Sequence, residues 1–411
     1  MQILAIANFI PMQDRSTGWF RFYHLLRVLA EKHEVVLHPF DLEWQCKYHG
    51  KEAICSYQDE LENLGVRITT GKWVELNRLM RAARLDIVFI EHYTAAKDFL
   101  DHVRFWQPKA RVIVDSIDIA FNRLSSKAML TGRPRDLQLA QTVKVEELSV
   151  YSYSDIVIGI SHADKALLEN ENPNLRVEVI PLIYATPSLQ RTKATSGRNV
   201  MFVGNFEHDP NVDGIVYFCT HVLPLIQSQL PDIRLRIVGE SPPEVVRALA
   251  GPNVEVLGYV PDIRAIYESS DVAIAPMRFG GGLKGKIAEA MSYGVPVVTN
   301  SIGLEGFGLS PGKDVLVGDN PADFAHAVVG VLRDANLYQV IREGGWNYVR
   351  AHFSEDVVAR MLNDVLIRSQ RYPAKKLGMG KWVRWKATHL LEKHVFWRFR
   401  RSALQGSGQR P

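Results

Sequence analysis

The sequence predicts an α/β protein made of two doubly wound, Rossmann-like domains that face each other across a cleft, followed by a basic tail. Three observations lead to this prediction. Short β-rich runs recur at intervals that leave room for helices, and most are continuously apolar, as strands buried on both faces of a parallel sheet are. The alternation of predicted strands and helices stops once, at a polar segment, and then restarts. The 411 residues correspond to two or three domains at about 150 residues each.

The first predicted domain spans residues 1–183. Its apolar runs alternate with helical patterns such as 20–32, and this alternation implies a parallel sheet with right-handed crossovers. The predicted strands lie at 3–7, 34–38, 66–69, 86–90, 111–114, 155–160 and 177–180.

Residues 184–197 are polar and aperiodic, contain Pro and Gly, and are interpreted as a linker. The second predicted domain, 198–353, repeats the strand–helix pattern, with one helix at 322–332. A last helix, within 354–370, follows and is expected to pack back across the first domain. The predicted strands of the second domain lie at 199–203, 233–238, 254–257, 271–275, 295–298 and 314–317.

The most informative stretch is the loop and helix after the strand at 271–275. Three glycines, Gly280 to Gly282, let the backbone approach a ligand, and the helix that begins near Ile287 offers unpaired N–H groups. Lys284 and Lys286 add positive charge, so the loop suits a diphosphate. Glu289 is placed to accept hydrogen bonds from vicinal hydroxyls such as those of a ribose. The alternative is an ordinary turn with solvated lysines.

Several spaced segments resemble the nucleotide-sugar-binding domain of the family 4 retaining glycosyltransferases, which have the two-domain GT-B fold. The similar segments occur in the order of that family and cover about 150 residues well, whereas the first domain is similar only loosely. They are 201–206 (MFVGNF), 208–214 (HDPNVDG), 237–240 (IVGE), 257–262 (LGYVPD), 266–276 (IYESSDVAIAP), 281–291 (GGLKGKIAEAM) and 294–298 (GVPVV).

The resemblance implies a donor site. Gly204 and Asn205 would line the phosphates, Lys284 and Lys286 would neutralise them, and Glu289 would hold the ribose. Two departures concern the donor sugar: the family's glutamate eight residues before Glu289 is replaced by Gly281, and Asn205 and Asp213 stand near the family's Arg and Lys. The full set of predicted donor-binding residues is Gly204, Asn205, Gly239, Glu240, Tyr259, Val260, Gly281, Gly282, Leu283, Lys284, Lys286 and Glu289.

Acceptor and catalytic residues are expected on the first domain, at the carboxyl ends of its strands, because ligands of doubly wound sheets bind there. The polar loop after the first strand resembles the family's acceptor loop. It contains Gly18, and Arg15 and Arg21 are expected to contact a lipid diphosphate; the alternative is surface arginines. Polar residues also follow the strands at 86–90 and 111–114. The resemblance implies that a His or Asp near the end of the second of these strands contacts the donor sugar, and the candidates are Asp118, Asp115 and His92.

Transfer of a glycosyl group leaves negative charge on the departing diphosphate, which lysines, a helix N-terminus and backbone N–H groups can stabilise. No Asp-x-Asp motif lies around the donor loop, so we expect no metal and no other cofactor. The resemblance implies retention of anomeric configuration. The expected substrates are a nucleotide sugar and a lipid-linked or polysaccharide acceptor for cell-surface glycan synthesis; sugar, base and linkage are not readable from these residues.

Other functions with the same fold predict different features. An NAD-dependent oxidoreductase requires a Gly-x-Gly-x-x-Gly turn after the first strand, and residues 8–13 (NFIPMQ) do not provide it. A nucleotide-sugar epimerase, or a non-catalytic sugar-nucleotide-binding or scaffold protein, remains open, the latter because of Gly281.

The net charge of +4 is unevenly distributed. Residues 371–411 contain eleven Lys or Arg and one acid, a net +10, which leaves −6 for residues 1–370. Aromatic residues lie among the cations, so we expect the tail to bind an anionic membrane surface, with a solvated tail or a nucleic-acid patch as alternatives.

Three scattered cysteines suit a reducing compartment. The predicted location is therefore cytoplasmic, peripheral on the inner face of the membrane.

Overall fold

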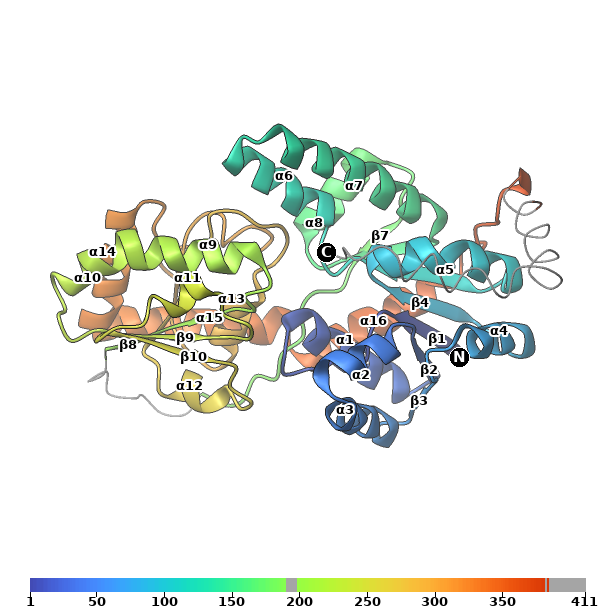
Figure 1. Cartoon of the computed structure of the whole chain (residues 1–411), viewed down its shortest axis with the longest axis horizontal. Helices are drawn as coiled ribbons and strands as arrows, with labels where there is room; N and C mark the ends of the chain where they lie inside the picture. Colours follow the sequence, from blue (N-terminus) through green and yellow to red (C-terminus); the bar gives the residue numbers. More distant parts are fainter. Residues whose placement is uncertain (190–197, 381–382, 384–411) are drawn as a thin grey trace.

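The computed structural model describes residues 1–189, 198–380 and 383. Within them the chain forms two all-parallel sheets, each covered by helices on both faces (Figure 1). The α/β fold class with two Rossmann-like units is thereby confirmed, and each run predicted as a strand overlaps an observed strand. Most of the predicted membrane-binding tail, residues 381–382 and 384–411, lies outside the described residues.

The first sheet has the strand order β3-β2-β1-β4-β5-β6-β7. The order reverses direction between β1 and β4, and such a switch point is where doubly wound sheets bind ligands. Its strands are β1 (Gln2–Ala7), β2 (Glu34–Pro39), β3 (Val66–Ile68), β4 (Ile87–Glu91), β5 (Arg111–Asp115), β6 (Ile156–Gly159) and β7 (Val177–Val179). Its helices are α1 (Thr17–Ala30), α2 (Leu42–His49), α3 (Lys51–Asn63), α4 (Trp73–Ala82), α5 (His92–Trp106), α6 (Ala120–Thr131), α7 (Pro134–Tyr153) and α8 (His162–Glu171).

The second sheet repeats this order as β10-β9-β8-β11-β12-β13, with its switch point between β8 and β11. Its strands are β8 (Asn199–Val203), β9 (Arg234–Val238), β10 (Val254–Gly258), β11 (Val272–Ala275), β12 (Val297–Thr299) and β13 (Leu316–Val317). The helical segments that follow β8 are α9 (Asp209–Tyr217), the π-helical turn η1 (Phe218–Val222), α10 (Leu223–Gln227), α11 (Glu244–Arg247), α12 (Arg264–Glu268), α13 (Gly285–Ser292), α14 (Pro321–Arg333), α15 (Ala335–His352) and α16 (Glu355–Ser369).

Helix boundaries follow from capping side chains. Helix α1 begins three residues earlier than its apolar pattern indicated, because Ser16 caps it by accepting a hydrogen bond from the Trp19 N–H at 3.2 Å. Ser161 caps α8 in the same way through the Asp164 N–H at 3.0 Å. These two caps matter for function because both helices begin at the side of the first sheet that faces the second.

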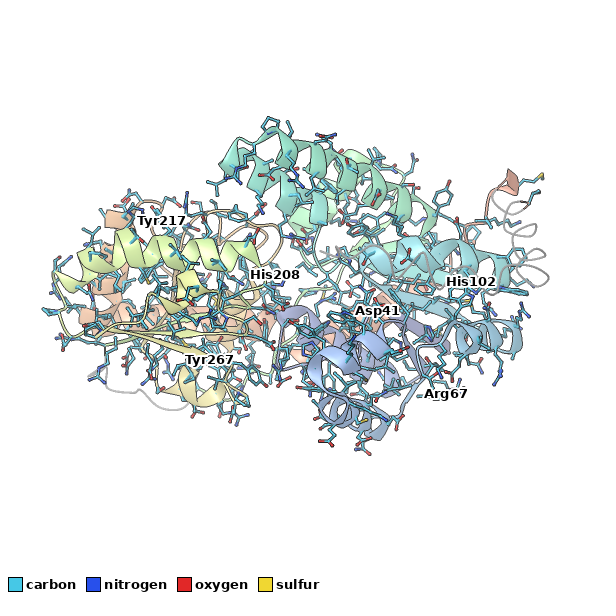
Figure 2. All side chains as sticks on the ribbon, in the orientation of Figure 1. Asp41, Arg67, His102, His208, Tyr217 and Tyr267 are labelled. Atoms are coloured by element: carbon cyan, nitrogen blue, oxygen red, sulfur yellow. The ribbon has the colours of Figure 1, made fainter. Side chains whose placement is uncertain are left out.

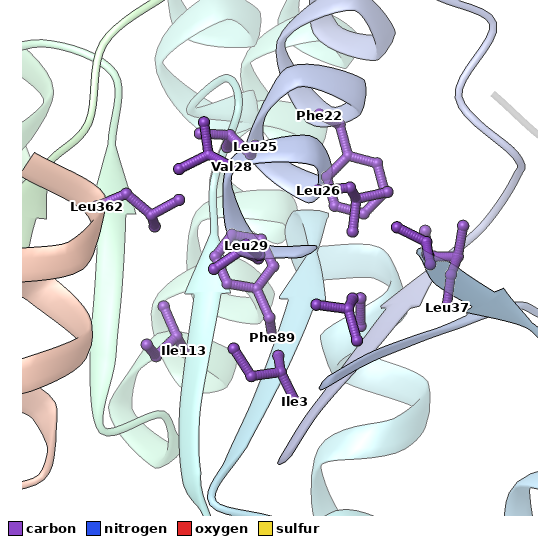
Figure 3. Packing of buried hydrophobic residues seen from close by; sticks show 14 of the residues in the cluster. Ile3, Phe22, Leu25, Leu26, Val28, Leu29, Leu37, Phe89, Ile113 and Leu362 are labelled. Atoms are coloured by element: carbon purple, nitrogen blue, oxygen red, sulfur yellow. The ribbon is translucent and has the colours of Figure 1, made fainter. Parts of the chain in front are cut away.

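The last helix, α16, packs against the first sheet although it follows the second. Leu362 is fully buried and joins the cluster that contains Leu25, Leu29 and Ile113 (Figure 3). Burying a leucine side chain contributes about 1.5–3 kcal/mol, so the contact ties the two domains together. The backbone adds one hydrogen bond at the crossing, from the Tyr184 N–H to the Phe353 carbonyl at 2.8 Å.

Candidate functional site

The carboxyl ends of the two sheets meet, and residues of both domains touch there. Ile160, which follows β6, lies in the same apolar cluster as Leu283, which precedes α13. A Cβ added to Gly285, at the start of α13, would lie 2.3 Å from Thr17 at the start of α1. The starts of these two helices are therefore in direct contact, and glycine is required at position 285 for that approach.

The start of α13 holds Lys286 above the end of the second sheet. Its ammonium group donates a hydrogen bond to Asn211 Oδ1 at 2.5 Å and lies 4.2 Å from the centroid of the Phe202 ring. No carboxylate partner of Lys286 is present among the described residues. Burial without a counter-charge lowers its pKa to about 7. The arrangement is suited to an anionic ligand, which would supply the missing negative charge.

Glu289 lies one helical turn beyond Lys286 and is half-buried. Burial raises the pKa of its carboxyl group to about 7, an effect that the adjacent Tyr267 hydroxyl opposes. Tyr267, labelled in Figure 2, is itself buried and stacks on Tyr293 with ring centroids 4.6 Å apart. The carboxylate lies on the helix beside this aromatic pair, where it can accept hydrogen bonds from hydroxyl groups.

Lys284 is more deeply buried than Lys286 and has its own partner. Its ammonium group lies 3.1 Å from the Glu305 carboxylate and 2.9 Å from the Gly282 carbonyl oxygen. Burial lowers its pKa, and Glu305 opposes that effect. Because Glu305 already balances its charge, Lys284 holds the glycine loop in place, whereas Lys286 is the lysine whose charge is left for a ligand.

Gly204 and Gly239, at the ends of β8 and β9, bring two turns into close contact. A Cβ on Gly239, where φ is +152°, would lie only 1.8 Å from the Gly204 carbonyl oxygen. Asn205 lies between these turns and Asn211, whose amide group donates to the Asn205 carbonyl at 2.6 Å. The two predicted phosphate-contact residues therefore adjoin the Lys286–Asn211 pair, and Asn211 is a member of the site to which the sequence analysis gave no role.

Two of the predicted donor-binding residues, Tyr259 and Glu240, contact the first domain. The Arg15 guanidinium forms an ion pair with Glu240 at 2.5 Å and lies 3.8 Å from the Tyr259 ring centroid. The Tyr259 hydroxyl donates to Asp14. Arg15, predicted to contact an acceptor, thus bridges the two domains at the mouth of the site; Val260 beside it is half-buried.

Asp118 lies opposite the glycine loop. A Cβ on Gly281 would be 3.2 Å from its Oδ1, and that oxygen is buried and makes no hydrogen bond to any described residue. Its other oxygen accepts a 2.6 Å hydrogen bond from Arg123. The carboxylate therefore points into the space that a side chain at position 281 would otherwise fill, which fits its predicted contact with a donor sugar.

His92 and Ile117 have left-handed backbone conformations, with φ of +68° and +58°. His92 directly follows β4, and Ile117 lies two residues beyond the end of β5, so backbone strain is concentrated where these strands end. Burial lowers the pKa of His92 to about 4, and the imidazole hydrogen-bonds to Thr94 at 2.9 Å. Gly18 allows the close approach of Ile117, because a Cβ there would lie 3.3 Å from the Ile117 side chain.

Two predicted site residues do not face the site. Arg21 is fully buried, forms an ion pair with Asp115, and donates to the carbonyl oxygens of Ile180 and Pro181 at 2.7 and 3.0 Å. Asp115 is fully buried as well. The expectation that Arg21 meets an acceptor, or Asp115 a donor sugar, does not fit this arrangement, because the pair joins β5 to the β7 end inside the first domain. Glu91 beside the pair has its pKa raised to about 8 by burial and by Asp115.

Further residues complete the site without a signal in the sequence. Glu147 is buried and accepts hydrogen bonds from the N–H groups of Ala120 and Phe121 at 3.2 and 3.0 Å, which caps α6 behind Asp118. His208, labelled in Figure 2, lies on the edge of the second domain that faces the first, within electrostatic reach of Asp118. Their partners are far away in the sequence, so only the fold identifies them.

A pocket of about 110 Å³ lies where the two domains meet, lined by the α8 cap residue Ser161, by Asp164 of α8, by Gly282, and by Glu305 and Gly306. Ligand sites for small molecules have volumes of about 300–1,000 Å³, so this pocket alone is smaller than such a site. A larger hollow of about 520 Å³ lies at the opposite, amino end of the first sheet, beside Gln2.

Two further properties of the described residues bear on ligands and membranes. In the described part of the chain, no three His, Cys, Asp or Glu side chains come together in a way that could hold a metal ion. Among the helices formed by those same residues, none combines the length and the apolar content that crossing a bilayer requires.

Comparisons with known proteins agree with this geometry. Residues 197–334 match the family model described as glycosyl transferases group 1. An uncharacterised 44.6 kDa protein in the cps region of Klebsiella pneumoniae is 27% identical over 169 residues, which are 39% of this chain and 44% of that protein. The phosphatidyl-myo-inositol mannosyltransferase of Mycobacterium leprae (strain TN) is 30% identical over 164 residues, 38% of this chain and 43% of that protein. The matches thus span less than half of each relative.

Solved structures are similar over most of the chain. Sucrose-phosphate synthase from Thermosynechococcus elongatus has a TM-score of 0.67 at 14% identity, covering 90% of this chain and 99% of that one. HepE from Anabaena in complex with UDP-glucose has a TM-score of 0.63 at 13% identity, covering 90% and 100%. The fold is that of the GT-B glycosyltransferases. The match to the glycosyl transferases group 1 model is confined to residues 197–334, the second of the two domains.

Proposed function

We propose that this protein is a retaining glycosyltransferase that moves a sugar from a nucleotide-sugar donor to a lipid-linked or polysaccharide acceptor in cell-surface glycan synthesis. The observation that carries the proposal is Lys286, a half-buried ammonium group without a carboxylate partner among the described residues, at the start of α13 and one turn from Glu289. The names of the relatives support it, since one is a mannosyltransferase and another lies in a cps region.

In the proposed reaction the bond between the sugar C1 and the diphosphate breaks, and its electron pair goes to the phosphate oxygen. Lys286 and the N–H groups at the start of α13 stabilise that charge. The acceptor oxygen forms the new bond to C1 on the same face, and its proton passes to the departing phosphate. Glu289 holds the ribose hydroxyls. No metal and no other cofactor takes part.

Asp118 supplies the carboxylate that the glycine loop lacks. Gly281 stands where the resembling family has a glutamate, and the unpaired Oδ1 of Asp118 points into that space from the first domain. We therefore assign the donor-sugar hydroxyl contact to Asp118, with His92 beside it. Because the acid comes from the opposite domain, it reaches the sugar only when the domains are closed.

A donor screen tests the proposal. Binding and slow hydrolysis are measured across UDP-, GDP- and ADP-sugars, first with the unaltered protein and then with Lys286→Ala and Glu289→Ala. Lys313→Ala, an exposed lysine of the same domain, serves as the control. We expect one donor class to bind, both site variants to weaken it at least tenfold, and the control to leave it unchanged. If neither site variant weakens any donor that binds, the assignment is wrong.

The remaining parts of the proposal have separate readouts. NMR of the anomeric proton of the product shows retention or inversion, and activity that persists in EDTA supports metal independence.

Donor binding without transfer to any lipid-linked or glycan acceptor would favour the alternative, a non-catalytic sugar-nucleotide-binding protein. Conversion of the donor itself into its epimer would favour an epimerase. Deletion of 371–411 tests the peripheral location on the cytoplasmic face, because we expect the shortened protein to leave the membrane fraction.

A further inference from the structure

The hairpin of α6 and α7 ends in an exposed apolar tip, defined here as residues 129–139. Every residue of the tip is exposed except Asp136, which is half-buried. Met129 is 79% exposed, Leu137 55% and Leu139 48%, and Leu130 joins them. Figure 1 shows the hairpin projecting from the body of the molecule. Soluble proteins seldom leave such large apolar side chains together in water, so the tip is a candidate contact surface.

The local sequence builds this tip as a rigid element. Gly132 ends α6 in a left-handed conformation with φ of +63°, and Pro134 begins α7. At the other end of the hairpin, Glu147 of α7 accepts the first N–H groups of α6. Both helices are thereby fixed to each other at base and tip. The apolar side chains are exposed because the first turns of α7 extend beyond the body.

The charges on the tip favour one kind of partner. Arg133 and Arg135 are exposed, and among the described residues neither takes part in an ion pair. The tip has a single acid, Asp136, whose carboxylate accepts a hydrogen bond from the Thr131 hydroxyl at 2.7 Å. Apolar side chains interspersed with unpaired arginines match the interface of an anionic bilayer, with an apolar layer beneath negatively charged headgroups.

We propose that the α6–α7 tip inserts Met129, Leu130, Leu137 and Leu139 into the interfacial layer of an anionic membrane, with Arg133 and Arg135 at the headgroups. The base of α6 lies at the donor loop, since Arg123 pairs with Asp118 there. Helix α6 is about 18 Å long, so insertion of its far end holds the cleft within that distance of the bilayer. The surface is separate from the donor site and lies wholly within the described residues, and the inference goes beyond the proposed function because it requires no transfer.

The test uses the full-length protein and vesicles of phosphatidylglycerol and phosphatidylethanolamine, with pure phosphatidylcholine for comparison. The tip variants are Met129→Asp with Leu137→Asp, and Arg133→Glu with Arg135→Glu. The matched control is Val245→Asp with Val340→Asp, two valines of the second domain that are 50% and 49% exposed. We expect roughly a tenfold or greater loss of partition to anionic vesicles for each tip variant, from lost apolar insertion or lost attraction to headgroups, and no loss for the control.

Residues 371–411 are themselves expected to bind anionic vesicles, so a local readout accompanies the partition measurement. Hydrogen–deuterium exchange reports whether amides of 129–139 become protected when the unaltered protein binds anionic vesicles. Protection there, absent at 244–247, supports the proposal. Unchanged partition of both tip variants together with unprotected tip amides would overturn it. Loss of self-association in the tip variants, with vesicle binding unchanged, would also overturn it and assign the surface to a second copy of the chain.

Discussion

Replacing Lys286 by methionine should stabilise the free protein and weaken donor binding, two effects of opposite sign. Burial without a counter-charge lowers the pKa of Lys286 from 10.5 to about 7. The folded protein therefore binds fewer protons than the unfolded chain between pH 7 and 10.5. Linkage requires that stability rises with pH in this window and that the cost of the buried lysine is largest at or below pH 7.

The size of the stabilisation follows from the difference between the pKa of Lys286 in the unfolded chain and in the folded protein. At about 1.4 kcal/mol per pKa unit, the buried charge costs up to about 5 kcal/mol below pH 7. Methionine removes this cost but leaves Asn211 Oδ1 without its 2.5 Å donor, which costs about 1–3 kcal/mol. We therefore expect Lys286→Met to raise the free energy of unfolding by about 2–4 kcal/mol at pH 7, with the gain vanishing between about pH 8 and pH 10, where the falling cost of the lysine equals the loss at Asn211.

Donor binding should change in the other direction. A hydrogen bond between charged groups contributes about 1.5–3 kcal/mol, so the variant should bind the nucleoside diphosphate of the donor that the screen identifies, written here as UDP, roughly 10- to 150-fold more weakly at pH 7. A bound diphosphate raises the pKa of Lys286, so UDP affinity of the unaltered protein should fall by up to about tenfold per pH unit above pH 7. The affinity of Lys286→Met should not follow this pH dependence.

Urea denaturation of the free protein and calorimetric titration with UDP measure the two effects. Lys284→Met is the matched comparison, since it leaves the Glu305 carboxylate without its 3.1 Å partner and should not stabilise the protein. The reasoning is refuted if Lys286→Met destabilises the free protein while UDP affinity stays the same, because Lys286 would then be a structural residue.

Three further predictions concern the first domain. Asp118→Asn should leave UDP affinity within about twofold and slow sugar transfer roughly 10- to 100-fold, because UDP lacks the sugar that this carboxylate is assigned to hold; equal losses for both would contradict the assignment. Arg21→Met should lower the free energy of unfolding in urea by about 3–5 kcal/mol, since it strands the buried Asp115 carboxylate; a loss below about 1 kcal/mol together with lost ligand binding would restore Arg21 to the site. Glu91→Gln should flatten the pH dependence of stability. The pKa of Glu91 is raised to about 8, so the native state keeps a proton that the unfolded chain loses above about pH 4.5, and stability falls as pH rises through this window. The free energy of unfolding of the variant should exceed that of the unaltered protein by about 4 kcal/mol at pH 8 and match it near pH 4.5; parallel pH profiles would be the contrary result.

Much of the site could be located from the sequence because strand ends and helix starts are local properties. Continuous apolar runs identified β8 and β11, and glycines with a following helical pattern identified the loop before α13. Lys286 and Glu289, one turn apart on that helix, follow from the same pattern. These features depend on residues within about ten positions of each other, a range over which periodicity and capping act.

The partners of those residues could not be predicted, since they come from distant parts of the chain. In the sequence, Arg21 cannot be told from Arg15, nor Asp115 from Asp118, because all four are charged residues near the end of a strand. The first two are buried against each other within one domain, whereas the second two face the opposite domain. Which group is buried depends on the strand order that sets β5 and β7 on either side of β6.

The sequence by itself therefore determined the two parallel sheets, the glycine loop and the helix that presents Lys286. Apolar periodicity and glycine conformation act locally and require no knowledge of distant contacts. Only the tertiary structure decided that Glu305 neutralises Lys284 but leaves Lys286 unpaired among the described residues, and that Asp118 points into the space beside Gly281. The physical reason is that charge balance and burial depend on how the two domains meet, and groups such as Arg15 and Glu240, 225 residues apart in the sequence, become neighbours only in the folded chain.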